Sequence, residues 1–122
     1  HGWFSSLFPL YLKKLYSDDP IFEKSKIISS LYSKAFDGNL SKSLAKKIQF
    51  DGIDENLDSI STPNFSSLSN LMIKFSDSVI FSSDNIEKDL KTSVKKHSKD
   101  SLSFKDSSSE EKLMDFLLKN ID

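Results

Sequence analysis

The sequence contains no cysteine and no arginine, and only three of its 122 residues are glycine. The missing cysteine excludes disulfides, thiolate metal sites and cysteine nucleophiles. Because every basic side chain is a lysine, the chain lacks the planar guanidinium that binds phosphate or carboxylate through two parallel hydrogen bonds. The glycines stand singly at positions 2, 38 and 52. This stretch therefore holds no glycine-rich phosphate loop.

Charge and apolar runs exclude further classes of protein. The formal net charge is -1, which provides no basic surface for nucleic acid or an anionic membrane. The apolar runs are far shorter than the roughly 18–20 residues of a membrane-spanning helix, and no signal segment opens the chain. With 37% hydrophobic residues and 10 Phe, the chain can form a core. We expect a folded cytoplasmic domain without nucleic-acid or membrane partners; the composition leaves its oligomeric state open.

Apolar residues at helical spacing predict several helices. One covers residues 4–16, where Pro9 shortens or kinks the first turn; another, weakly amphipathic, covers residues 41–50. Asn64 is expected to cap a helix running to Phe75, and Asp84 to cap a helix with an apolar stripe. That stripe consists of Ile86, Leu90 and Val94. A last helix is expected over residues 107–121, whereas residues 54–63 are polar and are expected to be irregular.

Short apolar runs at residues 27–32 and 78–82 predict buried strands, and residues 102–104 predict a third. Strands separated by helices favour right-handed crossovers and a parallel sheet. The fold class is therefore α/β, a parallel sheet flanked by helices, and no linker divides residues 1–122 into two domains. We expect the first two strands to be parallel neighbours. Residues 1–3 are interpreted as the exit of a strand that the sequence does not include.

Few residues are candidates for a functional site. Ligands of open α/β sheets bind at the carboxyl ends of the strands, which makes His1 a candidate. Trp3 beside it could stack on a sugar ring, although a Trp after a strand more often packs in the core. His97 stands among lysines and is interpreted as a solvated helix end. Neighbouring carboxylates lie in turns and at helix starts, where they cap rather than form acid–base pairs. No metal site is expected.

Four stretches in collinear order resemble one known family. They are His-Gly-Trp with the following Pro-Leu-Tyr-Leu-Lys, Asp-Asp-Pro at 18–20, the strand and turn of residues 25–38, and Phe-Ser-Asp-Ser-Val-Ile-Phe-Ser-Ser at 75–83. Together they are similar to the N-terminal domain of glycogen and starch synthases, which transfer glucose from ADP-glucose to an α-1,4-glucan. The resemblance implies a Rossmann-like, partial GT-B domain without cofactor, with ADP-glucose and an α-glucan acceptor as partners. It places the substrate surface at His1, Gly2, Trp3, Tyr32, Ser33, Ser82 and Ser83.

The chain departs from this pattern at the same surface. Phe4 stands where the family has a His directly after the Trp, and Gly2 stands where it has an Asp. Tyr32 and Ser33 replace the His and Asn of a Thr-Ile-His-Asn motif. No catalytic residue is assigned, and we expect the isolated chain to be inactive.

The pattern is most similar to a compact bacterial branch that carries only the N-terminal domain, of which this chain would be the C-terminal part. One alternative is a non-catalytic glucan-binding or scaffolding domain derived from a glycosyltransferase. The other is an α/β domain with coincidental motif matches.

Overall fold

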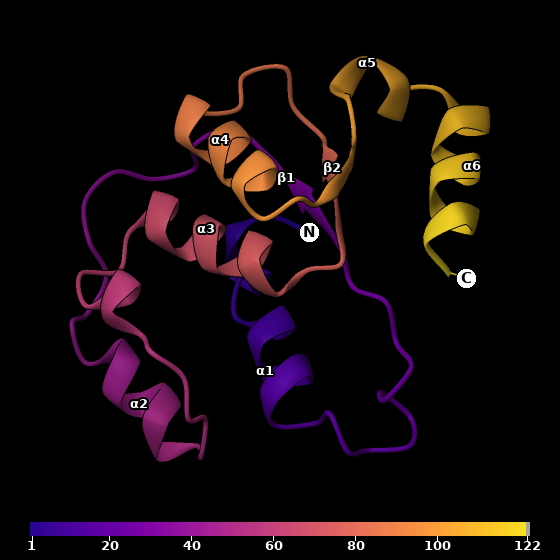
Figure 1. Cartoon of the computed structure of the whole chain (residues 1–122). Helices are drawn as coiled ribbons and strands as arrows, with labels where there is room; N and C mark the ends of the chain where they lie inside the picture. The colour runs from indigo at the N-terminus through magenta and orange to yellow at the C-terminus, as the bar shows by residue number, and fades with distance from the viewer. Residues whose placement is uncertain (122) are drawn as a thin grey trace.

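The computed structural model describes residues 1–121 and contains a three-stranded parallel sheet in the order β1-β2-β3 (Figure 1). The strands are β1 (Ile28–Leu31), β2 (Ser78–Phe81) and β3 (Asp100–Leu102). The helices are α1 (Phe8–Lys14), α2 (Leu44–Phe50), α3 (Phe65–Phe75), α4 (Lys88–Lys96), α5 (Phe104–Ser107) and α6 (Glu110–Ile121), with 3-10 turns at Trp3–Ser5 and Asp58–Ile60. β1 pairs with β2 in parallel, Ile28 opposite Ser78. The predicted α/β class is thus confirmed.

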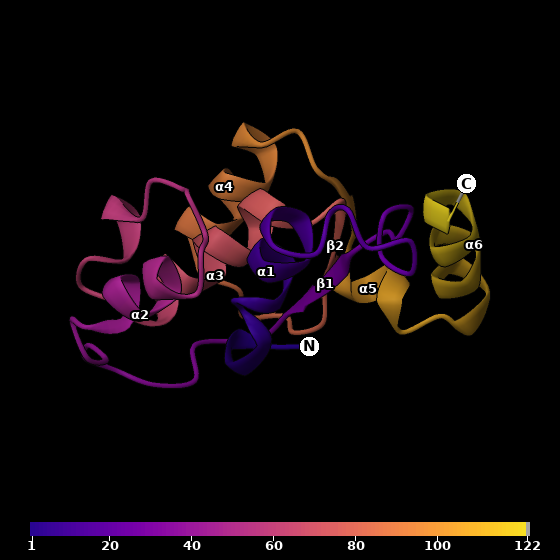
Figure 2. The same ribbon diagram turned by 90° about the horizontal axis from the view of Figure 1, so that it is seen from below.

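Different helices cover the two faces of the sheet (Figures 1 and 2). On one face, Leu31 and Val79 pack with side chains of α3 and α4 in a single buried cluster. On the other face, Ile80 and Leu102 pack against Phe116 of α6. Both faces of this parallel sheet are covered, so side chains on both sides of β1 and β2 are buried. This burial explains why the short runs that form these strands are mainly apolar. The first cluster also contains Phe65, Met72, Ile73, Ile86, Leu90 and Val94.

A second buried cluster lies on the far side of α3, away from the sheet. Leu10 of α1 and Ile48 of α2 pack there with Leu71 of α3. Residues 54–63, expected to be polar and irregular, supply the buried Leu57 and Ile60 to this cluster. α1 therefore packs against α3 rather than covering the sheet directly, because an apolar stripe can be buried by any neighbouring apolar surface.

Several helix boundaries agree with the sequence signals. α1 begins at Phe8 rather than at residue 4 as expected, and Pro9 lies in its first turn, where a missing N–H costs no intrahelical hydrogen bond. Asn64 caps α3: its side chain accepts from the backbone N–H of Ser67 at 2.9 Å, and the Ser67 hydroxyl accepts from the Asn64 N–H. The reciprocal pair is a capping box.

Other local expectations were wrong. Asp84 does not cap a helix, because α4 begins only at Lys88. The third strand is shifted toward the N-terminus and ends at Leu102, since the Ser103 side chain accepts from the Asp106 N–H and starts α5. Because the short helix α5 ends at Ser107, the last helix begins at Glu110 rather than at the expected residue 107.

Three lysines of α1 and α3 form ion pairs with carboxylates of the same chain. Lys13 pairs with Asp77 at 2.9 Å. Lys14 of α1 and Lys74 of α3 both pair with Glu55, at 2.9 and 2.8 Å. These contacts join the loop before the second 3-10 turn to two helices. Hydrogen bonding by the two lysines holds the pKa of Glu55 below its ordinary value against the opposing effect of burial.

Candidate functional site

The predicted site residues from the N-terminus and from β1 lie together at the carboxyl end of the sheet. The Gly2 backbone N–H donates to the Ser30 carbonyl over 3.0 Å, so the start of the chain runs beside β1. The Tyr32 hydroxyl and His1 Nδ1 are 3.4 Å apart. Gly2 has a φ of 69°, a conformation in which glycine is strongly favoured. This turn brings the His1 ring over the residue that follows β1.

The predicted serines connect the loops that follow the two central strands. Ser33 Oγ and Ser83 Oγ lie 3.0 Å apart, one from the loop after β1 and the other from the loop after β2. The Ser82 backbone N–H donates to the Leu31 carbonyl at 2.8 Å and extends the parallel pairing by one bond. Each hydroxyl has one donor and two acceptor positions. The pair can therefore still hydrogen-bond a polar ligand at this end.

Trp3 has a mainly structural position. It is half-buried and packs against both large clusters, with its ring centroid 4.6 Å from that of Phe36. The exposed aromatic ring is that of Phe4, which is 88% exposed and meets the Trp3 ring edge to face at 5.6 Å. In the sequence, Phe4 is identified as the start of an apolar helical pattern and as the replacement of a family histidine, but not as a stacking surface. Trp3 packs inward, so the next residue of the 3-10 turn faces outward, and no signal in the sequence identifies this turn.

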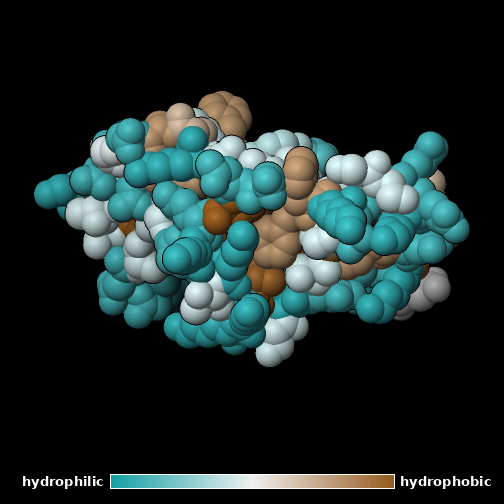
Figure 3. All heavy atoms as spheres, turned by 90° about the horizontal axis from the view of Figure 1, so that it is seen from above, coloured by the Kyte–Doolittle hydropathy of each residue, from teal (hydrophilic) through white to brown (hydrophobic). Residues whose placement is uncertain are grey.

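Figure 3 looks onto the end of the molecule at which the strands finish. Hydrophobic side chains gather at its centre and hydrophilic ones surround them. A small hollow of about 220 Å3 lies between the loop after β1 and the start of α3. It is lined by Lys34, Phe36, Gly38, Asn39, Asn64, Phe65, Ser66 and Glu87. The amide and hydroxyl groups in this lining suit contact with sugar hydroxyls.

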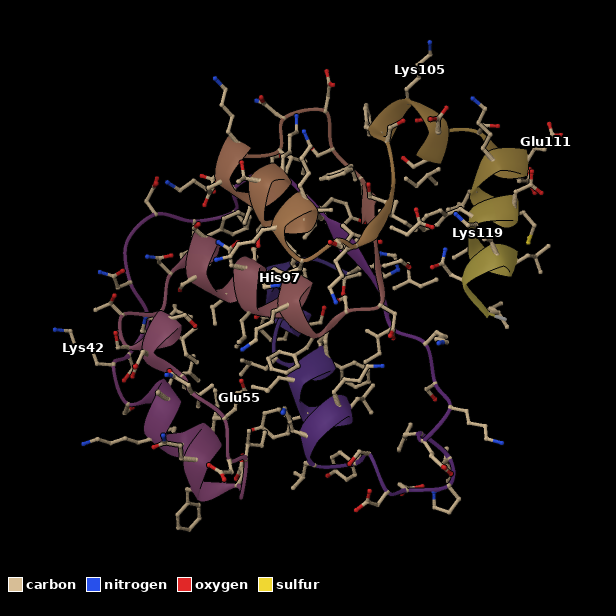
Figure 4. All side chains as sticks on the ribbon, viewed as in Figure 1. Lys42, Glu55, His97, Lys105, Glu111 and Lys119 are labelled. Atoms are coloured by element: carbon tan, nitrogen blue, oxygen red, sulfur yellow. The ribbon has the colours of Figure 1, made fainter. Side chains whose placement is uncertain are left out.

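His97 lies far from this end, at the carboxyl ends of α3 and α4 (Figure 4). It is half-buried and lines a hollow of about 780 Å3, where a solvated helix end was expected. Burial lowers the pKa of His97, and the charges of Lys99, Lys96 and Lys74 lower it further. The sequence shows the lysines nearest to His97 in the chain, but Lys74 reaches it only through the packing of α3 on α4.

A parallel sheet with helices on both faces defines a Rossmann-like α/β domain, consistent with the N-terminal domain of a GT-B glycosyltransferase. The starch synthase catalytic domain matches this chain over residues 1–103. The chain belongs to this family. The matched segment runs from His1 through β3 and ends at Ser103, so α5 and α6 lie outside it. Comparison with curated proteins and with solved structures finds no match.

Two further searches of residues 1–121 concern other classes of site. No helix in this range has the length and apolar character needed to cross a membrane. Nor do three or more His, Asp or Glu side chains gather in it as a metal ion would require.

Proposed function

We propose that this chain is the C-terminal part of one starch-synthase-type domain, from a protein that transfers glucose from ADP-glucose to an α-1,4-glucan. The observation that carries the proposal is the family match over residues 1–103, which spans all three strands. We further propose that this protein belongs to the compact bacterial branch that the sequence motifs resemble. The carboxyl end of the sheet is the surface that would face the substrates.

The open edge of β1 supports the proposal that more of the same domain precedes His1. Within residues 1–121, β1 pairs along one edge with β2, and its other edge accepts a single bond from Gly2. A hollow of about 500 Å3 follows this edge, with Phe8, Leu12 and Phe22 among its lining residues. An unpaired strand edge beside apolar side chains favours the addition of another strand. A strand parallel to β1 and ending at His1 would continue the pairing that Gly2 begins.

The residues at the carboxyl end have binding roles in this proposal. The His1 ring and Tyr32 hydroxyl would hydrogen-bond sugar hydroxyls, as would Ser33, Ser82 and Ser83. Phe4 would provide a ring face for stacking, with Trp3 as its support. Transfer also needs groups that stabilise the leaving diphosphate and hold the donor in position. Because this chain has neither arginine nor a phosphate loop, we infer that it does not catalyse transfer alone.

Incorporation of radiolabelled glucose from ADP-glucose into glycogen tests the proposal. The protein that contains this chain with its natural flanking sequence should incorporate label, whereas residues 1–122 alone should remain at the level of a heat-treated control. No incorporation by the longer protein, in the presence of measurable maltoheptaose binding, would instead establish a non-catalytic glucan-binding domain. Phe4, Tyr32 and Ser33, which replace two histidines and an asparagine of the family pattern, favour that second candidate.

A further inference from the structure

The second feature that suggests ligand binding is the hollow between α3 and α4, which shares Asn64 and Ser66 with the small hollow at the carboxyl end of the sheet and extends from there to His97. Ser66, Asn70 and Lys74 follow one another at intervals of four along α3 and line it from one side. From α4 and its end come Asp89, Thr92, Ser93, Lys96 and His97. The two helices start together, where the Ser66 hydroxyl donates to Asp89. They also end together, with His97 between their last turns (Figure 4).

The two ends of this hollow differ in charge. Asp89 lies at the start of the helices, and its carboxylate accepts a hydrogen bond from the Ser66 hydroxyl. Lys74, Lys96 and His97 lie at the opposite end, and the charge of Lys99 also acts on His97. Each helix end contributes about half a negative charge there, and Glu55 pairs with Lys74. Glu55 is shared with Lys14, however, and Lys96 forms no ion pair within residues 1–121. The field at this end is therefore positive.

The lining restricts the class of ligand. A hollow of about 780 Å3 is within the usual size of small-molecule sites, roughly 300–1,000 Å3. Leu71 is its one apolar lining residue and no Phe, Tyr or Trp ring lines it, so neither a nucleobase nor an uncharged glucan finds a large aromatic stacking surface. The remaining groups are amides and hydroxyls that match sugar hydroxyls. Lysine and histidine at one end match a phosphate group.

We propose that the hollow between α3 and α4 binds a sugar phosphate. The phosphate group is held by Lys74, Lys96 and His97, and the sugar hydroxyls meet Asn70, Thr92 and Ser93. Asp89 at the far end sets the orientation, because it repels the phosphate and can accept from a sugar hydroxyl. The phosphate-binding end of the site, at Lys74, Lys96 and His97, is distinct from the substrate surface at the carboxyl end, although Asn64 and Ser66 line the hollows of both. The proposal does not depend on the function proposed for that surface.

Titration of the 15N-labelled 122-residue chain with glucose 1-phosphate tests this site by NMR. Amide signals of α3 and α4 next to Asn70, Lys96 and His97 should shift, and the pKa of the His97 ring should rise on saturation. Glucose 1-phosphate should bind about tenfold more tightly than inorganic phosphate, since the sugar adds its own hydrogen bonds. Maltoheptaose should leave these signals unchanged.

Substitutions in the protein test the contacts to the phosphate group and the contacts to the sugar separately. Lys96→Gln, at an exposed position, should weaken glucose 1-phosphate about tenfold, whereas Lys42→Gln, at an exposed position that does not line the hollow, should not. Asn70→Ala should weaken glucose 1-phosphate but not inorganic phosphate. Equal affinity for glucose 1-phosphate and inorganic phosphate, shifts confined to other regions, or affinity unchanged by Lys96→Gln would each overturn the proposal.

Discussion

The carboxylate of Asp77 accepts a hydrogen bond from the backbone N–H of Ile27 over 2.7 Å. Asp77 directly precedes β2 and Ile27 directly precedes β1, so this bond joins the starts of two paired strands. The same carboxylate pairs with Lys13 of α1 at 2.9 Å. One side chain thus connects the sheet to a helix that otherwise packs on α3.

Replacing Asp77 by Ala should lower the free energy of unfolding by about 1–3 kcal/mol, because the Ile27 N–H loses a charged acceptor. Urea unfolding followed by circular dichroism measures this loss, and the exposed Asp54→Ala serves as the matched control. A loss no greater than that of the control would show that the bond does not hold the strands together.

The same group predicts a dependence on acid. Burial alone would raise the pKa of Asp77, but the Ile27 N–H and the Lys13 ammonium outweigh burial and hold it below its ordinary value of 3.8. A carboxyl with a lower pKa in the folded state stabilises the fold above its unfolded pKa. This contribution should therefore be complete above about pH 4 and disappear as the pH falls through the folded pKa. Unfolding curves of Asp77→Ala should lack this part of the acid dependence.

His97 should give a separate pH effect near neutrality. Burial and the surrounding lysines lower its pKa from the ordinary value of 6.5, so the unfolded chain binds more protons in this range. Stability should then decrease as the pH falls from about 7 to about 5. His97→Gln should flatten this slope in urea midpoints, and an unchanged slope would contradict the assigned environment.

Gly2→Ala should destabilise the chain by about 1–3 kcal/mol, since a φ of 69° with a ψ of 176° is a backbone conformation almost restricted to glycine. The added Cβ would lie 3.7 Å from the Tyr32 ring, an ordinary contact. The cost therefore comes from the backbone rather than from crowding. Thermal unfolding measures it. Stability equal to that of the wild type would mean that Gly2 does not keep this conformation in solution.

Maltoheptaose should bind weakly at the carboxyl end, because a single exposed surface buries little of the ligand. Phe4→Ala should lower the affinity several-fold through loss of a stacking face, and Phe50→Ala, at a position 91% exposed, is the matched control. Tyr32→Ala should also lower it. Trp3→Ala should do the same, but with a loss of stability because Trp3 packs in both large clusters. His97→Ala should leave the affinity for maltoheptaose unchanged. NMR shifts centred on His97 would show that glucan does not bind at the carboxyl end of the sheet and would contradict this prediction.

Local signals in the sequence determined much of the fold. The runs around Ile28 and Val79 are apolar and short enough to be strands. Asn64 and Ser67 lie within a single turn and together cap the start of α3. The spacing of Ile86 and Leu90 likewise predicts the buried face that the structure shows. The position of His1 beside the residue after β1 also followed from sequence, because parallel strands end at one edge of a sheet.

Tertiary structure decided what these residues contact. Trp3 is drawn inward by Phe36, which leaves Phe4 exposed. Lys74 joins Glu55 and acts on His97 although both lie far from it in sequence. α1 packs on α3 because apolar periodicity identifies a face that must be buried but not the surface that buries it. Positions of this kind depend on long-range packing, which a single sequence specifies only through the complete fold.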